Sequence, residues 1–341
     1  MSTTSIWISL RNPVFRNLWL ASVLSGCCVS AHDMAATWVM NTLTPSPLLL
    51  SLLSTAASLP FFLLTFPAGA LADMVNRKKL LSVMHVWLAL TAAGLAVLGS
   101  LKLLSPSIVL AAVFLLGIGF ACNAPAWTSV IPDVVSKEEL PSALILGGVQ
   151  MNISGVIGPA LGGLLLPSIG PNWIFALNAV GFLVVLAAVL WWPRTHKRLR
   201  APAESVLESF VGALRYVRYS RGIQIVLVRA FLFALLISVI PALLPVVGLK
   251  ALHLSSSHLG ILFTSLAIGS LLGAVFVVPW ARNHFTSNQV TILASLLLAL
   301  VYILMAAVRQ LDTFIVVAAL AGLGWTLAAS ELWVVAQQAM P

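Results

Sequence analysis

Ten long apolar runs, separated by short polar connections, constrain this chain more than any other feature of its sequence. A helix needs about 20 apolar residues to cross a hydrocarbon core of about 30 Å. Open strand edges would leave backbone groups unpaired in lipid, so we predict that the runs are membrane-spanning helices. The predicted spans are residues 15–40, 48–71, 80–101, 107–130, 141–166, 174–192, 223–247, 259–280, 290–308 and 313–335.

Composition and charge placement agree with a membrane protein. Only 8% of the 341 residues are charged, whereas a soluble domain carries about 25%. With a cytoplasmic N-terminus, only Lys102, Lys250 and Arg309 of the 18 Lys and Arg residues fall in loops on the opposite side. This bias predicts a multi-pass inner (plasma) membrane protein with a cytoplasmic N-terminus. The net charge of +9 then indicates contact with the lipid bilayer and not with nucleic acid.

The longest polar stretch, residues 193–222, follows six spans and divides the chain. We expect a six-helix bundle over residues 1–193, a basic amphipathic cytoplasmic linker over 194–222 and a second bundle over 223–341. A Leu-Leu-Gly-Ile-Gly run at 115–119 is echoed by Leu-Ala-Gly-Leu-Gly at 320–324, which indicates related halves. Two further helices would complete the second half, so we expect that bundle to be incomplete and the chain truncated after its tenth helix.

A short motif follows the second span. Starting at Gly69, the sequence reads Gly-Ala-Leu-Ala-Asp-Met-Val-Asn-Arg-Lys-Lys, which resembles the motif between helices two and three of the major facilitator superfamily. Gly69 permits close helix approach, Asp73 suits the positive end of a helix, and Arg77 suits a carboxylate at a helix end. With Asp133, these residues form a candidate conformational switch. Asn76 replaces the usual second glycine and tolerates a left-handed backbone; the alternative is an ordinary basic loop.

A longer resemblance covers residues 123–163. It includes Asn-Ala-Pro-Ala-Trp from Asn123, Ile-Pro-Asp ending at Asp133, and Gly-Pro-Ala-Leu-Gly-Gly ending at Gly163. This stretch, like the opening Asn-Pro-Val-Phe-Arg-Asn-Leu-Trp from Asn12, is similar to the branch of transmembrane secretion effectors that includes the enterobactin exporter. The resemblance implies an all-α integral membrane protein with the major facilitator fold. In such a fold, Val113 stands where many proton antiporters carry an arginine.

Small and polar residues inside the spans are candidates for function. The final run of that resemblance contributes a helix-packing and bending motif of Gly158, Pro159, Gly162 and Gly163; plain helix packing is the alternative. An ionisable group in a span costs at least about 2.5–3.5 kcal/mol and is therefore a functional candidate. The candidate proton or substrate pathway comprises Asp33, Arg229, Glu331, Asn123, Gln150 and Asn152.

Each pathway candidate also has a structural interpretation. Asp33 lies towards the end of its span, where it could reach the membrane interface, and the three amide side chains could join helices. Arg229 and Glu331 each lie six residues, or about 9 Å, from the same membrane face. A lone charge at that depth is costly, so we predict an ion pair between them.

The leading hypothesis is a monomeric secondary transporter. It would export a small amphipathic molecule, siderophore-like or drug-like, by alternating access, with Asp33 and Glu331 carrying protons. A non-functional truncated fragment is one alternative. The other is a membrane enzyme acting on lipid-linked substrates, which would need a cluster of His, Asp or Glu that this sequence lacks. A phosphate loop is also absent, and the scattered His and Cys residues predict no metal site and no cofactor.

Overall fold

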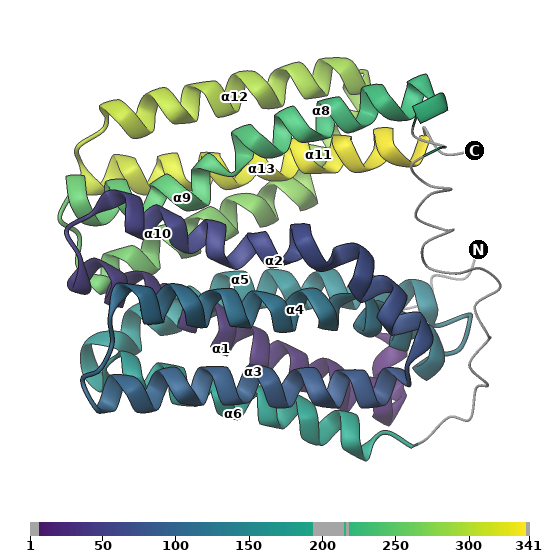
Figure 1. Cartoon of the computed structure of the whole chain (residues 1–341). Helices are drawn as coiled ribbons and strands as arrows, with labels where there is room; N and C mark the ends of the chain where they lie inside the picture. The colour runs from purple at the N-terminus through teal and green to yellow at the C-terminus, as the bar shows by residue number, and fades with distance from the viewer. Residues whose placement is uncertain (1–6, 194–214, 216–217, 339–341) are drawn as a thin grey trace. The chain divides into compact units, whose positions relative to one another are not determined.

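The computed structural model describes residues 7–193, 215 and 218–338 (Figure 1). Within these ranges, ten helical segments are long and apolar enough to cross a membrane, and no residue forms a strand. The predicted all-α class and the ten spans are confirmed. The chain divides into two compact units, residues 1–202 and 203–341. Most of the predicted linker, residues 194–214 and 216–217, lies outside the described residues.

Unit 1 holds the first six spans, and most of its helices begin with a proline in the first turn. The side chains of Asn12, Ser46 and Ser105 cap the helices that follow them, because they satisfy backbone N–H groups that lack a helical partner. The elements are η1 (Ile8–Arg11), α1 (Pro13–Leu43), α2 (Pro47–Met74), α3 (Arg77–Ser100), α4 (Pro106–Val134), α5 (Leu140–Ile169) and α6 (Pro171–Trp191).

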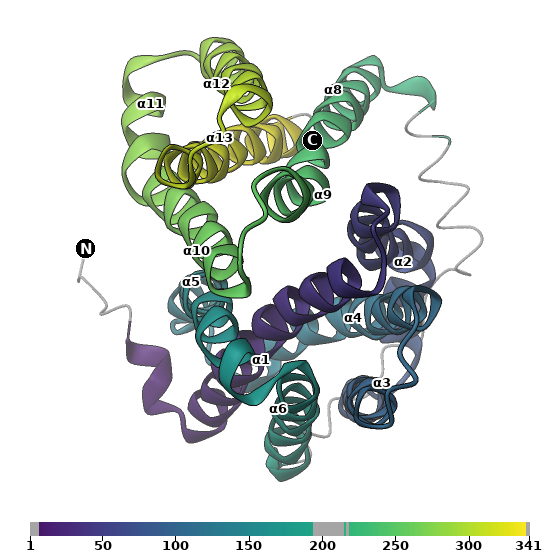
Figure 2. The same cartoon turned by 90° about the vertical axis from the view of Figure 1, so that its left-hand side faces the viewer.

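Helix α1 packs against both α5 and α6, while α3 packs against α4 and α6 (Figure 2). The contact between α1 and α5 uses the glycine-proline motif. A Cβ atom on Gly158 would lie 2.7 Å from the Cys27 carbonyl oxygen, and one on Gly162 would lie 3.2 Å from the Ala31 Cα atom. Pro159 lies inside α5, and both Pro159 and Gly163 are buried. Glycine at these positions therefore sets how closely the two helices approach.

Unit 2 holds four spans, two of which are interrupted. The seventh consists of α8 (Arg221–Ile237), α9 (Val239–Val246) and the π-helical turn η2 (Val247–Ala251). The eighth consists of α10 (Ser256–Leu272), the π-helical turn η3 (Gly273–Val277) and α11 (Val278–His284). The last two are α12 (Ser287–Ala307) and α13 (Leu311–Gln338). Such interruptions are frequent at functional positions in helices.

The sequence echo between the halves marks the same packing contact in each unit. Helix α4 packs on α2, and α13 packs on α10. A Cβ atom on Gly117 would lie 2.8 Å from the Ala57 carbonyl oxygen of α2, and one on Gly322 would overlap the Leu266 carbonyl oxygen of α10. The repeated glycines therefore allow the fourth span of each unit to approach the second span closely.

Candidate functional site at the connector end

Helices α2 and α3 are joined by only two residues. Asn76 has an extended backbone, with φ −62° and ψ 116°, and its side chain accepts a hydrogen bond from the Lys79 N–H at 3.1 Å. The left-handed backbone considered for Asn76 is therefore not used, and the residue instead caps α3. A Cβ atom on Gly69 would have no described atom within 4 Å. The side chain of Asp73 lies outside the described residues.

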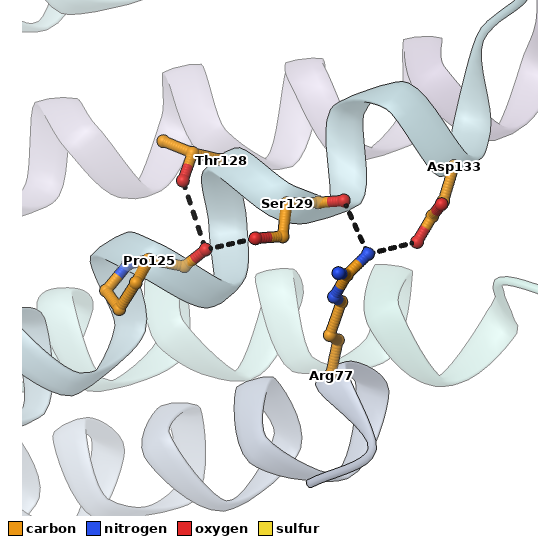
Figure 3. Close-up of polar contacts among 5 residues, drawn as sticks. All are labelled: Arg77, Pro125, Thr128, Ser129 and Asp133. Atoms are coloured by element: carbon orange, nitrogen blue, oxygen red, sulfur yellow. Dashed lines mark hydrogen bonds and ion pairs between the residues drawn. The ribbon is translucent and has the colours of Figure 1, made fainter. Parts of the chain in front are cut away.

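Arg77, the first residue of α3, contacts the end of α4 (Figure 3). Its Nη1 atom lies 2.8 Å from the Asp133 carboxylate, and it donates to the Ser129 carbonyl oxygen at 3.1 Å. The Asp133 side chain is 14% exposed, so the carboxylate is largely but not completely buried. A guanidinium here neutralises both the carboxylate and the negative end of the α4 dipole.

Two side-chain hydroxyls bond to the backbone near the end of α4 (Figure 3). The hydroxyls of Thr128 and Ser129 donate to the Pro125 carbonyl oxygen at 3.0 and 2.8 Å. Such back-bonding often bends a helix. Pro132, also inside α4, removes one further backbone donor. The end of α4 that bears Asp133 is therefore held by side-chain contacts as well as by backbone hydrogen bonds.

Lys78 joins the start of α3 to the end of α6. Its Nζ atom donates to the carbonyl oxygens of Leu190 and Trp192, at 2.8 and 2.6 Å. The last carbonyls of a helix have no helical donor, and a cation there also interacts favourably with the helix dipole. Consecutive basic residues therefore tie α3 to two different helix ends.

The N-terminal segment holds the α4–α5 connection. Asn12 accepts hydrogen bonds from the N–H groups of Val14 and Phe15, and its Nδ2 atom donates to the Val134 carbonyl oxygen at 2.8 Å. Ser9, fully buried, donates through its hydroxyl to the Glu139 carbonyl oxygen at 2.8 Å. We call this group of contacts around Ser9, Asn12, Arg77, Lys78 and Asp133 the connector cluster.

Unit 2 has a related cluster around a buried carboxylate. Glu331 of α13 is 3% exposed. Its Oε1 atom lies 3.0 Å from the Nε atom of Arg282, and its Oε2 atom accepts from the Ser287 hydroxyl at 2.8 Å. Arg282 also donates to the Ser330 carbonyl oxygen at 3.1 Å. As in the connector cluster, an arginine next to the junction of the second and third spans of its unit pairs with a carboxylate of the fourth.

The predicted ion pair between Arg229 and Glu331 is wrong. Arg229 instead donates to the Asn288 side-chain oxygen at 3.2 Å. Both residues thus contact the start of α12, but at neighbouring positions. Arg282 near the end of α11 and Ser287 at the start of α12 satisfy both Glu331 oxygens, which removes the energetic reason for Arg229 to approach.

Asp33 is the one pathway candidate that is an exposed residue. Trp19, Ser22, Gly26 and Asp33 follow one another at spacings of three, four and seven residues, which places them on one face of α1. Asp33 itself makes no side-chain hydrogen bond or ion pair with the described residues. Its carboxylate is therefore available to a proton or a ligand.

Of the three amide candidates, Gln150 and Asn152 form hydrogen bonds to helices, whereas Asn123 has an unsatisfied side-chain oxygen. Gln150 of α5 donates to the Ser22 carbonyl oxygen at 3.3 Å and to the Ser154 hydroxyl at 3.2 Å, so it joins α5 to α1. Asn152 donates to the Gly148 carbonyl oxygen in its own helix. The Asn123 side-chain oxygen is buried and has no hydrogen-bond partner among the described atoms.

Sequence reasoning missed a second set of unsatisfied groups, in the contact between α1 and α6. His32 is 0% and Asn178 is 1% exposed, and neither side chain has a hydrogen-bond partner within the described ranges. The His32 ring lies against Phe175, with ring centroids 4.7 Å apart. A histidine in the first span was the available signal. No group of three or more His, Cys, Asp or Glu among the described residues could hold a metal ion.

Comparisons with known proteins give these contacts a family context. The sequence profile described as transmembrane secretion effector matches residues 4–341. This chain belongs to that family. This chain is similar to the enterobactin exporter of Citrobacter koseri. The two share 28% identity over 269 residues, which cover 77% of this chain and 63% of the relative. This chain is also similar to macrolide efflux protein A of Streptococcus pyogenes, with 23% identity, covering 77% and 65% of the two chains.

Solved structures with the same fold are transporters. A bacterial homologue of the human lysosomal transporter Spinster, in an inward-facing and unoccupied conformation, matches with a TM-score of 0.69 at 19% identity, covering 95% of this chain and 74% of the other. A nucleoside transporter matches with a TM-score of 0.71 at 13% identity, covering 94% and 81%. These matches confirm the major facilitator fold. This chain spans slightly less than two thirds of the length of the two curated relatives named above.

Proposed function

We propose that this chain belongs to a secondary exporter of small amphipathic molecules and works by alternating access. The observation that carries the proposal is the Arg77–Asp133 contact, formed within the motif that resembles the family's switch. An ion pair that joins two helix ends stabilises one arrangement of those helices relative to any arrangement that separates them. The two named relatives, an enterobactin exporter and a macrolide efflux protein, indicate the kind of molecule to test.

Efflux and binding, measured on one purified preparation, test the switch. Arg77→Lys keeps the charge but loses the forked donor geometry, and Asp133→Asn removes the charge. We expect both variants to lower the efflux of a radiolabelled macrolide or enterobactin from proteoliposomes while equilibrium binding is retained. Lys137→Gln, at an exposed basic position of the α4–α5 connection, is the matched control. Lost binding, with normal turnover of whatever still binds, would contradict the role.

Asp73 belongs to the same proposal through its sequence position. It lies at the end of α2, in the last turn of the helix. We propose that its charge influences the balance between inward-open and outward-open states. Asp73→Asn should therefore impair turnover more than binding, as measured by the same pair of assays.

Proton coupling is proposed for Asp33 alone. Both oxygens of the Glu331 carboxylate are already engaged, by Arg282 and by Ser287, so we assign Glu331 to a contact that holds unit 2 together. Asp33, on the face of α1 that also carries Trp19 and Ser22, is an exposed residue whose side chain bonds to none of the described residues. Protonation and release there would couple a proton gradient to the alternation of states.

Orientation in the membrane is proposed from the lopsided placement of Lys and Arg. With a cytoplasmic N-terminus, exposed Ser136 of the α4–α5 connection faces the cytoplasm, and exposed Leu103 of the α3–α4 connection faces the opposite side. A cysteine at Ser136, in a background without native cysteines, should be protected from an impermeant reagent in intact cells. A cysteine at Leu103 should react, and the reverse pattern would overturn the orientation.

A further inference from the structure

A groove runs between α1 and α6, at the end of unit 1 that holds the connector cluster. It is an open groove, with a volume of about 570 Å³. Aliphatic side chains form most of its wall, among them Leu20 and Leu24 of α1 and Val184 and Ala187 of α6. The small side chains of Ala21 and Ala187 face the groove, so the two helices leave space that side chains do not fill.

The groove is amphipathic along its length. Asn17 lies near the start of α1, and Trp191 is the last residue of α6, so these two residues mark the mouth. Leu24 and Val184 lie seven residues deeper in their helices, which is about 10 Å. A tryptophan at the mouth of an apolar groove is typical of the headgroup level of a membrane. The dimensions and polarity match an acyl chain below a lipid headgroup.

An unengaged cation lies at this mouth. Arg16 is exposed, directly precedes Asn17 and lies one helical turn from Leu20. Within the part of the chain that the structure describes, its guanidinium forms no hydrogen bond or ion pair. Arg77 and Lys78, at the same end of unit 1, are instead bonded to helix ends. Arg16 is therefore free to bind a phosphate group.

We propose that the α1–α6 groove binds a phospholipid with an anionic headgroup. Its acyl chain lies between Leu24 and Val184, and its phosphate is paired with Arg16. A basic position between membrane helices at the headgroup level is the chemistry that selects anionic lipids. The proposal depends on membrane insertion and on the geometry of unit 1, and it does not depend on transport.

Native mass spectrometry of the full chain tests lipid retention. The protein is purified in mild detergent with phosphatidylglycerol or phosphatidylcholine. We expect one retained phosphatidylglycerol molecule and weaker retention of phosphatidylcholine. A basic residue at a membrane surface contributes enough affinity for about a five-fold change. Arg16→Gln should therefore lower phosphatidylglycerol retention about five-fold and leave phosphatidylcholine retention unchanged, whereas Ala187→Trp should abolish the retention of both by filling the groove.

Matched controls separate this site from general surface effects. Lys79→Gln removes an exposed cation at the start of α3, and Leu183→Trp adds bulk on an exposed position of α6 outside the groove. Both controls should retain phosphatidylglycerol as the parent chain does. The proposal is overturned if Lys79→Gln matches Arg16→Gln, or if retention survives in both Ala187→Trp and the smaller variant Ala187→Phe. The latter result would mean that the retained lipid binds elsewhere on the chain.

Discussion

Asn12 performs two tasks that substitution can separate. Its side-chain oxygen accepts from the N–H groups of Val14 and Phe15 at 3.0 and 3.3 Å and so caps α1. Its Nδ2 atom donates to the Val134 carbonyl oxygen, 122 positions away, at 2.8 Å. Serine ranks with asparagine as a helix cap but has no amide donor. Asn12→Ser should thus remove only the contact to α4, whereas Asn12→Ala removes both.

The expected sizes follow from the bonds that each variant loses. One neutral hydrogen bond contributes about 1 kcal/mol, and one helix cap contributes about 1 kcal/mol. We therefore expect Asn12→Ser to lower the free energy of local opening by about 1 kcal/mol at the α4–α5 connection. Asn12→Ala should lower it by a similar amount there and also at the start of α1. A change of 1 kcal/mol corresponds to about five-fold faster amide exchange.

Hydrogen–deuterium exchange of the chain in lipid nanodiscs measures the two sites separately. Asn12→Ser should accelerate exchange over residues 135–139 about five-fold and leave the amides of Val14 and Phe15 unchanged. Asn152→Ser is the matched control, because the Asn152 amide bonds only within its own helix. The reasoning fails if Asn12→Ser leaves residues 135–139 unchanged, or if Asn152→Ser accelerates them equally.

Three further predictions concern single side chains. Gly322→Ala should lower the thermal unfolding temperature, by the equivalent of about 1–3 kcal/mol, because its Cβ would overlap a backbone oxygen; Gly147→Ala, with no atom within 4 Å of its Cβ, should not. Glu331→Leu should destabilise the chain by about 1–3 kcal/mol in denaturant unfolding. This is less than the loss of a fully buried pair costs, because Arg282 is 42% exposed. The control is Arg309→Leu, which changes a cation with no carboxylate partner in the described ranges and should alter the stability by no more than about 0.5 kcal/mol. Asp33→Asn should make efflux from proteoliposomes insensitive to an imposed pH gradient while substrate exchange at equal pH continues, and retained sensitivity would refute proton coupling through Asp33.

The sequence alone determined the features that depend on local pattern. The ten spans follow from the length of the apolar runs, since lipid leaves helix as the available structure for each run. Asn12 and Ser46, each followed by a proline, are also a local pattern, and both cap the helices that begin after them. The echoed glycines of the fourth and tenth spans indicated related halves, because close packing requires the same residue wherever the same contact recurs.

Only the tertiary structure decided which side chains meet. Depth along a span was readable for Arg229 and Glu331, but the direction around each helix and the identity of its neighbour were not. Glu331 therefore pairs with Arg282, and Lys78 reaches carbonyl groups more than 100 positions away. The unsatisfied His32 and Asn178 also became visible only when α1 was placed against α6. A sequence fixes position along one dimension, whereas hydrogen bonds and ion pairs depend on distance in three.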